Sequence, residues 1–379
     1  MSTPSCLQQH IWVMAKGYAP DEGGMQSYAR GVAEAYAASG AHVTVFGQST
    51  VGPRREQVGS VFLIDVGPGK SARVPLRLAA AMRRQLRATG RPLFVHGTTW
   101  RTSLLPLVLR LPYVTPFHGR EFMGGGSLAR QLMFRIAKRA LAVIAVSRYT
   151  ATRLVSRLGP ECPQPLVLWN GTSVLEMPHR SAALQDEASP VTILSLCRLE
   201  KRKNIAACVR ACARLRQEGL DFRYLIAGRG PELETIRTLV EELQLRDRVA
   251  VLGRVETAQL SDLYDRADIF LHPQIAVDDE RDFEGFGITI ADAMMHKVAV
   301  IAGRAGGPAD IIEDGVTGLL VDGENDDELV AALRRLVSGS ALRTRLAEAG
   351  SRHANTHFRW DLHVAGILDK LRAAPLSIP

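Results

Sequence analysis

The sequence predicts an α/β protein made of two open parallel-sheet domains that face each other across a cleft. Its 379 residues are enough for two or three domains at about 150 residues each. Short apolar runs alternate with helix-sized segments, a pattern typical of parallel strands whose connecting helices cover both faces of a sheet. The alternation stops between residues 174 and 190 and then begins again, so we interpret the chain as two similar halves joined by a linker.

The first half contains the elements of one complete sheet. It opens with a strand at 11–14, a loop that contains Gly23 and Gly24, and a helix at 25–38. Further strands are expected at 42–46, 61–66, 93–96, 113–117, 142–146 and 166–168, and further helices at 74–88, 101–110, 127–140 and 149–157. Apolar runs of this kind, bounded by turn residues, are typical of strands buried on both faces.

The second half repeats this plan. Strands are expected at 191–196, 224–227, 249–252, 269–272, 298–302 and 318–321, and helices at 204–217, 231–244, 257–266, 288–296 and 326–337. A last helical segment extends from about 351 to 371. Open α/β sheets bind ligands at the carboxyl ends of their strands, so the expected cleft is the default functional site.

Composition excludes several classes of protein. The chain is 46% hydrophobic and 23% charged, as in ordinary globular proteins, and no apolar run reaches the ~18 residues of a membrane-spanning helix. The opening residues MSTPSCLQQH lack a basic flank before an apolar stretch, so no secretory signal is expected. The 5 cysteines form no CxxC pair, which argues against a zinc site and favours a reduced, cytoplasmic protein.

Charge is distributed unevenly between the halves. Residues 1–180 hold 22 Lys and Arg against 8 Asp and Glu, whereas residues 181–379 hold 25 against 31. Either the first half meets an anionic partner, or its arginines are solvated surface residues. Nucleic acid is not the expected partner, because aromatic residues are sparse in this half and no groove-reading motif appears.

Two loops have the composition of anion-binding sites. Gly23 and Gly24 open the first helix, where backbone N–H groups can approach an anion, although paired glycines are equally typical of ordinary turns. Arg198 and Lys203 follow the strand at 191–196 and would suit a diphosphate, although alone they are also compatible with a solvated basic loop. Neither half carries GxGxxG after its first strand, so no dinucleotide cofactor is expected.

The segment FEGFGITIADAM adds two carboxylates to the second half. Glu284 precedes a Gly-Phe-Gly turn that opens the helix at 288–296, and Asp292 lies one turn inside that helix on the same side. Backbone N–H groups around Gly287 could cap an anionic group. One carboxylate would bind sugar hydroxyls and the other a ribose, whereas helix capping by acidic groups would explain only one of them.

These motifs occur together in a recognisable order, and the chain resembles a family 4 glycosyltransferase of the GT-B fold. The matching segments are GGMQSYARGVAEAYAASGAHVTVF, FHGREF, VSRYT, LWNGTS, CRLEKRKN, IAGRGPELE, VLGRV, ADIFLHP, EGFGITIADAM and GGPADIIEDGVTGLLV. The resemblance implies a Rossmann-like acceptor-binding domain at 1–178 and a Rossmann-like nucleotide-sugar donor domain at 179–355. It also implies that a C-terminal helix at about 356–375 joins the first domain.

The resemblance assigns roles to individual residues. His118 would lie near the transferred sugar, with Glu121 in the same HGRE turn. Arg198 and Lys203 would carry the diphosphate, and Glu284 would bind sugar hydroxyls. The remaining donor-binding residues would be Gly23, Gly24, Arg254, Phe286, Gly287, Ile288 and Asp292, with Arg254 bordering the nucleobase.

The sequence departs from the family pattern at two acidic positions. Asp292 stands where the family has a second glutamate, and Asp310 in GGPAD stands where a GGxxE segment is usual. An aspartate is one methylene shorter than a glutamate, so we expect an altered contact with the donor's ribose, with activity retained.

The resemblance implies a retaining glycosyltransferase that moves a mannose- or glucose-type hexose from a nucleoside diphosphate sugar. The expected acceptor is a lipid-linked glycan in the synthesis of cell-surface exopolysaccharide or lipopolysaccharide. Asp278 and Asp279 could imitate a metal-binding pair but are better interpreted as a polar loop, so neither a metal nor another cofactor is expected. The alternatives are transfer to a soluble small-molecule acceptor and a nucleotide-sugar epimerase of the same fold.

Two basic helices predict that the first domain docks on an anionic membrane, on the cytoplasmic side. Basic residues near an anionic leaflet gain about 1 kcal/mol each, and exposed apolar groups add shallow insertion. The residues concerned are Leu76, Arg77, Leu78, Met82, Arg83, Arg84, Leu86 and Arg87 in the first helix, and Arg130, Leu132, Met133, Phe134, Arg135, Ile136, Lys138 and Arg139 in the second. The alternative is that the apolar residues pack on the sheet and the arginines are only solvated.

Overall fold

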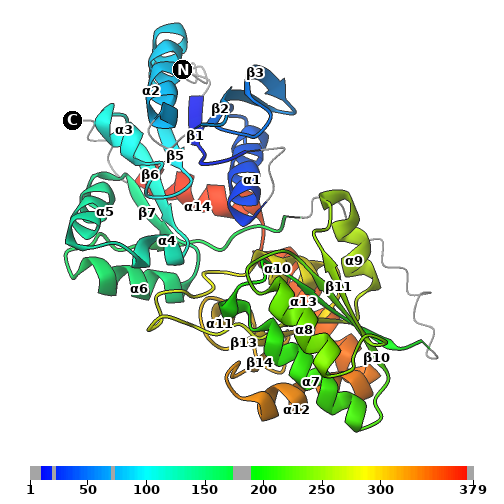
Figure 1. Ribbon diagram of the computed structural model, residues 1–379. Helices are drawn as coiled ribbons and strands as arrows, with labels where there is room; N and C mark the ends of the chain where they lie inside the picture. The colour runs from blue at the N-terminus through cyan, green and yellow to red at the C-terminus, as the bar shows by residue number, and fades with distance from the viewer. Residues whose placement is uncertain (1–9, 19–22, 70–72, 174–188, 374–379) are drawn as a thin grey trace, which may run out of the picture. The chain divides into compact units, whose positions relative to one another are not determined.

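The computed structural model describes residues 10–18, 23–69, 73–173 and 189–373 (Figure 1). They form two compact units, one made of the chain up to Gly171 together with the chain from Arg359, and the other of Thr172–Phe358. The domain boundary expected after residue 178 falls within 174–188, which lies outside the described residues. The C-terminal helix α14 (Trp360–Ala373) belongs to the first unit.

The first unit is built on an eight-stranded sheet in the order β3-β4-β2-β1-β5-β6-β7-β8. All neighbouring strands of this sheet are parallel except β3 and β4. The strands are β1 (His10–Met14), β2 (His42–Gly47), β3 (Pro53–Val58), β4 (Val61–Val66), β5 (Phe94–Gly97), β6 (Tyr113–Phe117), β7 (Ala142–Ala145) and β8 (Leu166–Val167). The helices are α1 (Gly24–Ala38), α2 (Arg73–Thr89), α3 (Leu104–Val108), α4 (Arg120–Met123), α5 (Ser127–Arg139), α6 (Arg148–Leu158) and α14. Apart from β3, the strands match the sequence prediction, as do α1, α2, α5 and α6, whereas α3 is shorter than the helix expected at 101–110.

The edge strand β3 is not predicted by the sequence pattern. Its sequence PRREQV is mostly exposed and begins with proline, so it lacks the apolar alternation by which strands are recognised. It pairs antiparallel with β4 through a tight turn at Gly59, whose φ is 57°. Proline and charged side chains at a sheet edge also discourage pairing with a further strand.

A tryptophan docks α14 on the rest of the first unit. The Trp360 indole lies against Gly31 of α1 and against Gly171, at points where a Cβ on either glycine would overlap the ring. It also meets Tyr28 of α1 edge-on, with ring centroids 5.4 Å apart. The small size of the two glycines therefore creates the space that Trp360 fills.

A buried hydrogen-bond chain joins the same helices to the sheet. Nδ1 of His363 donates to the carbonyl oxygen of Trp169 at 2.9 Å, so its Nε2 accepts from the Tyr28 hydroxyl at 3.0 Å. The Tyr28 oxygen then accepts from Nε2 of His96, and Tyr36 donates to the other ring nitrogen of His96, each at 3.0 Å. Burial lowers the pKa of His363 to about 4 and that of His96 well below its usual value, so both rings are neutral at pH 7. The donor and the acceptor of every hydrogen bond in this chain are therefore fixed.

The second unit is a six-stranded parallel sheet in the order β11-β10-β9-β12-β13-β14. The strands are β9 (Val191–Leu196), β10 (Phe222–Ala227), β11 (Val249–Gly253), β12 (Ile269–His272), β13 (Ala299–Gly303) and β14 (Leu319–Val321). The helices are α7 (Ile205–Gln217), α8 (Leu233–Glu242), α9 (Leu260–Arg266), α10 (Ile288–Met295), α11 (Pro308–Ile311), α12 (Asp326–Ser338) and α13 (Ser340–His357), with short 3-10 turns η2 (Lys201–Lys203) and η3 (Thr257–Gln259). Every predicted strand of this half is confirmed.

The last helical segment differs from the prediction. The sequence predicts one helix at about 351–371, whereas the structure has two helices, α13 and α14, that are separated at Phe358 and Arg359. Phe358 is fully buried in the second unit and meets Phe286 edge-on at 5.6 Å, and its backbone leaves the helical region at φ −98° and ψ 68°. The helix ends there because this ring anchors the chain in the second unit before it enters the first.

Gly31→Ala should lower the free energy of unfolding by about 1–3 kcal/mol, because the new methyl group overlaps the Trp360 ring and forces repacking. Gly124→Ala is the matched control, since Gly124 has open space around it and an ordinary φ of −79° in the same unit. Urea denaturation of both variants measures the difference. Equal unfolding midpoints for the two would contradict the packing of α14 on α1.

Candidate functional site

The second sheet reverses its strand order between β9 and β12. Strands β10 and β11 extend the sheet on one side of β9, while β12, β13 and β14 extend it on the other. Open α/β sheets bind ligands at the carboxyl ends of the strands, at this reversal. The turn η2 follows β9 and the segment 273–287 follows β12, so both come to this point.

Two cationic side chains form ion pairs with Glu284 at this edge of the sheet. Its Oε2 pairs with the Lys203 ammonium and lies 2.7 Å from Nη1 of Arg202. Lys203 is only 7% exposed. Burial by itself raises the pKa of Glu284, but Lys203 and then Arg202 outweigh it and hold that pKa well below the usual carboxyl range. Glu284 is therefore ionised at neutral pH.

His272, the last residue of β12, lies beside this pair. Its Nε2 is 3.3 Å from Nζ of Lys203, and its ring stacks on Phe270 with centroids 6.0 Å apart. Burial and the Lys203 charge lower the pKa of His272 to about 4. A neutral ring accepts from the ammonium through Nε2, which places its own proton on Nδ1. His272 thus orients Lys203 without adding a charge.

Two other predicted site cations, Arg198 and Arg254, are more exposed than Lys203. The side chain of Arg198 is 76% exposed and pairs with Glu200 at 3.1 Å. Arg254 follows β11 at the edge of the sheet and lies 3.6 Å from Glu256. The structure therefore joins Lys203 to Glu284, whereas Arg198 pairs with Glu200 and Arg254 with Glu256, so the contacts of these two arginines with a ligand stay predictions.

Two glycines after β13 fix the loop that carries Glu284. The N–H of Gly307 donates to the carbonyl oxygen of Glu284 at 2.8 Å. A Cβ on Gly306 would overlap that carbonyl oxygen, and one on Gly307 would overlap the carbonyl oxygen of Gly285. Gly306 also has a φ of 88°. Only glycine allows this close approach of two backbones, which sets the position of Glu284.

Helix α10 begins directly after this loop. Gly287 is its N-cap residue with a φ of 93°, and no side chain caps the first turn. Phe286 is buried against Phe358, which holds the turn in place. The positive end of α10, starting at Ile288, has the geometry and charge that suit an anionic group.

Asp292 is bonded inside its own unit. It is 1% exposed, accepts from the N–H of Ser173 at 2.7 Å, and also accepts from the Ser173 hydroxyl. The sequence predicts that Asp292 and Glu284 bind one ligand together, whereas in the structure Asp292 bonds to Ser173 and Glu284 pairs with Lys203 and Arg202. The ribose contact of Asp292 stays a prediction, and the structure adds a role in holding Ser173.

In the first unit, His118 follows β6 and leans toward the end of β5. Its Nε2 donates to the carbonyl oxygen of Thr98 at 2.9 Å, which leaves Nδ1 as the acceptor. Burial lowers the pKa of His118 to about 4, so the ring is neutral. Glu121 accepts from the backbone N–H of His118 at 2.6 Å and holds the turn.

The glycine pair of the first unit lies at the start of α1. Gly23 is the N-cap residue, with φ 142° and ψ 166°, and Gly24 is the first helical residue. Both are exposed, and no side chain caps this helix. The site residues of the first unit are thus a helix start and a neutral histidine, each after a parallel strand.

Comparisons with known proteins agree with this geometry. Residues 22–172 match the family described as "Glycosyltransferase Family 4", and residues 180–353 match "Glycosyl transferases group 1". The chain belongs to glycosyltransferase family 4. The fold is GT-B: sucrose-phosphate synthase from Thermosynechococcus elongatus matches with a TM-score of 0.80 at 22% identity, over 97% of this chain and 100% of that chain.

Two curated relatives of this glycosyltransferase have named activities. A GDP-mannose-dependent alpha-(1-6)-phosphatidylinositol monomannoside mannosyltransferase of Mycobacterium tuberculosis is 29% identical over 291 residues, which are 73% of this chain and 75% of that protein. The amylovoran biosynthesis glycosyltransferase AmsK of Erwinia amylovora is 30% identical over 70% of this chain and 65% of that protein.

Sequence reasoning missed three residues around Glu284 in this glycosyltransferase. Arg202 stands among other cations in KRKN, and its charge alone does not distinguish it from a solvated residue. Asp282 lies in a polar loop, and the structure places its Oδ1 3.2 Å from Nε of Arg202. His272 offers a signal that was available, because a histidine that ends a buried apolar strand faces the carboxyl edge where ligands bind.

Replacing Asp292 should destabilise this glycosyltransferase whatever its contact with a ligand. Asp292→Ala removes the acceptor of both Ser173 donors at a buried position, a loss of about 1–3 kcal/mol. Denaturant unfolding of Asp292→Ala, Ser173→Ala and the double variant should give a coupling of at least about 0.5 kcal/mol. Strictly additive losses would show that the two residues do not interact.

Proposed function

We propose that this enzyme is a retaining, metal-independent hexosyltransferase that moves a mannose- or glucose-type sugar from a nucleoside diphosphate sugar to a lipid-linked glycan in cell-surface polysaccharide synthesis. The observation that carries the proposal is the ionised carboxylate of Glu284, held between Lys203 and Arg202 where the strand order reverses. An ionised carboxylate accepts hydrogen bonds from sugar hydroxyls, and the adjacent ammonium attracts a diphosphate.

The transfer step places its largest charge change on the leaving group. The bond from the anomeric carbon to the diphosphate oxygen breaks, a bond to the acceptor oxygen forms on the same face, and the acceptor proton passes to the leaving phosphate. The anomeric carbon has oxocarbenium character during this exchange. Lys203 and the start of α10 at Ile288 stabilise the growing negative charge, which is the role that a divalent cation has in other enzymes.

The relatives support the substrate classes of this proposal. The Mycobacterium tuberculosis protein is described as dependent on GDP-mannose and as acting on a phosphatidylinositol mannoside, which is a lipid-linked sugar. The Erwinia amylovora protein is described as acting in amylovoran biosynthesis. The first description fits a hexose donor and a lipid-linked acceptor, and the second fits a role in polysaccharide synthesis.

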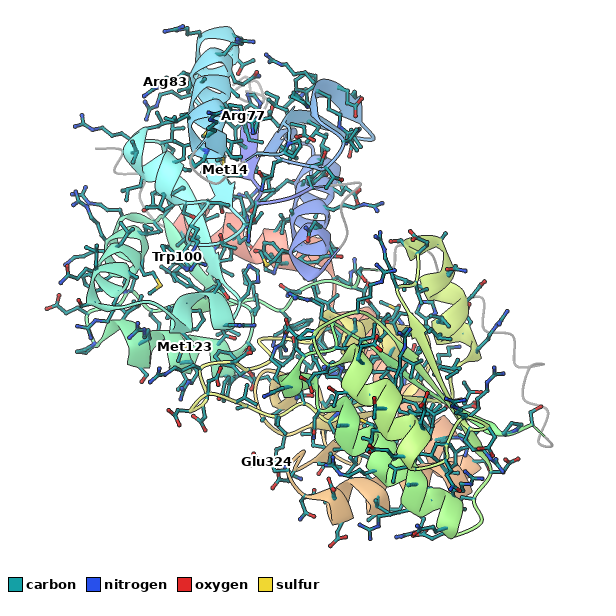
Figure 2. The ribbon with its side chains drawn as sticks, in the orientation of Figure 1. Met14, Arg77, Arg83, Trp100, Met123 and Glu324 are labelled. Carbon is teal, nitrogen blue, oxygen red and sulfur yellow. The ribbon has the colours of Figure 1, made fainter. Side chains whose placement is uncertain are left out.

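The surface of the first unit favours an acceptor at an anionic membrane. Helix α2 carries exposed arginines at positions 83, 84 and 87, and its Leu76 is 71% exposed (Figure 2 labels Arg83 on this helix). Leu128, at the start of α5, is 78% exposed. We place the enzyme at the cytoplasmic face, where anionic lipids attract such a surface. In the described part of the chain, no helix is both long and apolar enough to cross a bilayer.

The structure corrects which residues of the two basic helices face outward. Four apolar side chains that were expected at the membrane are buried in the core, namely Leu78, Met82, Met133 and Ile136. Arg77 donates to the carbonyl oxygens of Gly67 and Pro68 at 3.2 and 2.8 Å. The apolar faces of both helices pack against the core of the first unit, as is usual for amphipathic helices that cover a sheet. Attraction to a membrane would therefore come from the outward-facing arginines and a few exposed leucines.

Purified enzyme should release nucleoside diphosphate from a nucleotide sugar only when a glycolipid acceptor is present, and EDTA should not stop it. Lys203→Ala should slow turnover about 10²–10³-fold, the usual effect of removing a group that stabilises transition-state charge. Arg210→Ala is the matched control, because Arg210 lies on α7 and its exposed side chain pairs with Asp326 of α12. Loss of activity in EDTA with recovery in Mg²⁺ or Mn²⁺ would contradict metal independence, and sugar interconversion without an acceptor would indicate an epimerase.

Flotation with liposomes should show more enzyme on phosphatidylglycerol vesicles than on neutral ones, with less binding in high salt. Charge reversal of Arg83, Arg84 and Arg87 to Glu should abolish that preference. The control reverses three exposed arginines of the second unit, Arg237, Arg246 and Arg352, which changes the net charge equally. Negligible binding to both kinds of vesicle would favour a soluble acceptor.

A further inference from the structure

We propose that Arg202 is a positioning residue that holds Glu284 in place while Lys203 turns to the donor's diphosphate. This inference rests on the proposed function and deepens it, because it separates recognition of the sugar from recognition of the nucleoside diphosphate. Arg202 itself would touch neither the sugar nor the phosphates.

The Arg202 guanidinium meets three carboxylates. Nη1 is 2.7 Å from Glu284, Nε is 3.2 Å from Asp282, and Nη2 is 3.5 Å from Glu200. Its backbone carbonyl oxygen also accepts from the N–H of Ile275 at 2.9 Å. Glu200 comes from the loop after β9, whereas the other partners come from the loop after β12. Arg202 therefore fixes the two loops to each other through both its side chain and its backbone.

Lys203 has fewer restraints. Its ammonium contacts Glu284 and lies 3.3 Å from Nε2 of His272, a neutral ring that exerts no attraction between full charges. A lysine ammonium is a point charge with three rotatable donors, whereas an arginine presents a rigid planar fork. Of the two cations on Glu284, Lys203 is therefore the one that has fewer charged partners to give up when it exchanges.

A bound diphosphate provides the reason for that exchange. In the structure, three cations (Arg198, Arg202 and Lys203) are matched by three carboxylates (Glu200, Asp282 and Glu284). The cluster is thus neutral before a donor binds. A diphosphate adds negative charge and competes with Glu284 for Lys203, while Arg202 stays with its three carboxylates and keeps Glu284 ionised. Glu284 is then available to the sugar hydroxyls in a fixed position.

This division of roles predicts two different effects on affinity. Losing Arg202 should weaken binding of the intact nucleotide sugar, because Glu284 is no longer held against the hydroxyls. It should leave the nucleoside diphosphate unaffected, because Lys203 and the start of α10 remain. Losing Lys203 should weaken both ligands.

The test measures the dissociation constants of the enzyme for a nucleotide sugar and for the matching nucleoside diphosphate. The pair is UDP-glucose and UDP or GDP-mannose and GDP, whichever the wild-type enzyme binds. Arg202→Gln should raise the dissociation constant for the nucleotide sugar by about tenfold or more, which is the effect of losing a hydrogen bond to a charged group. The same variant should raise the dissociation constant for the nucleoside diphosphate by less than about threefold. Arg202→Lys should not restore affinity, since the guanidinium meets its three carboxylates through three separate nitrogens, whereas the single nitrogen of an ammonium cannot occupy all three positions. Arg210→Gln is the control, and Lys203→Met should weaken both ligands.

Asp282→Asn is the second variant if Arg202→Gln does not fold, because it frees Nε of the guanidinium and should act in the same direction. Parallel weakening of both ligands by the Arg202 and Asp282 variants, or no weakening, would overturn the positioning role while leaving the proposed function intact. A wild-type enzyme that binds none of the four ligands would overturn the proposed function and, with it, this inference.

Discussion

The site of the second unit is organised around the carboxylate of Glu284, a side chain that is 15% exposed and that two cations contact. A largely buried ionised group without a partner is costly, and Lys203 and Arg202 both offset that cost for Glu284. Both cations come from the turn after β9, whereas Glu284 comes from the loop after β12. Their pairing thus ties the two loops together where the strand order reverses. Gly307 adds the loop after β13 through its bond to the Glu284 carbonyl.

This constraint gives the site its chemical character. Glu284 is ionised and His272 is neutral at pH 7, so the cluster offers one strong acceptor and cations that can be shared with an anionic ligand. The start of α10 lies four residues after Glu284 and contributes its positive end without a capping side chain. A nucleotide sugar presents hydroxyl donors beside a diphosphate, which is the complementary pattern. In this proposal the fold binds both parts of the donor from adjoining loops.

Much of this architecture could be predicted from sequence, because periodicity reports burial directly. The strand at 298–302 is a continuous apolar run, the strand at 269–272 is apolar up to its last residue, and their neighbours follow from the parallel plan. The edge strand β3 could not be predicted, since its polar sequence has no buried face. Lys203 and Glu284 were predicted as site residues, but the central position of Arg202 depends on three carboxylates that only the folded loops bring together. The contact of Asp292 with Ser173 joins residues 119 positions apart and likewise has no local signal.

The most direct test of the exchange at Glu284 is a crystal structure with an intact nucleotide sugar bound. We expect Nζ of Lys203 on a diphosphate oxygen, Nη1 of Arg202 still on Glu284, and a Glu284 oxygen within hydrogen-bond distance of a sugar hydroxyl. A donor whose sugar lies away from Glu284, with the Lys203–Glu284 pair unchanged, would contradict it.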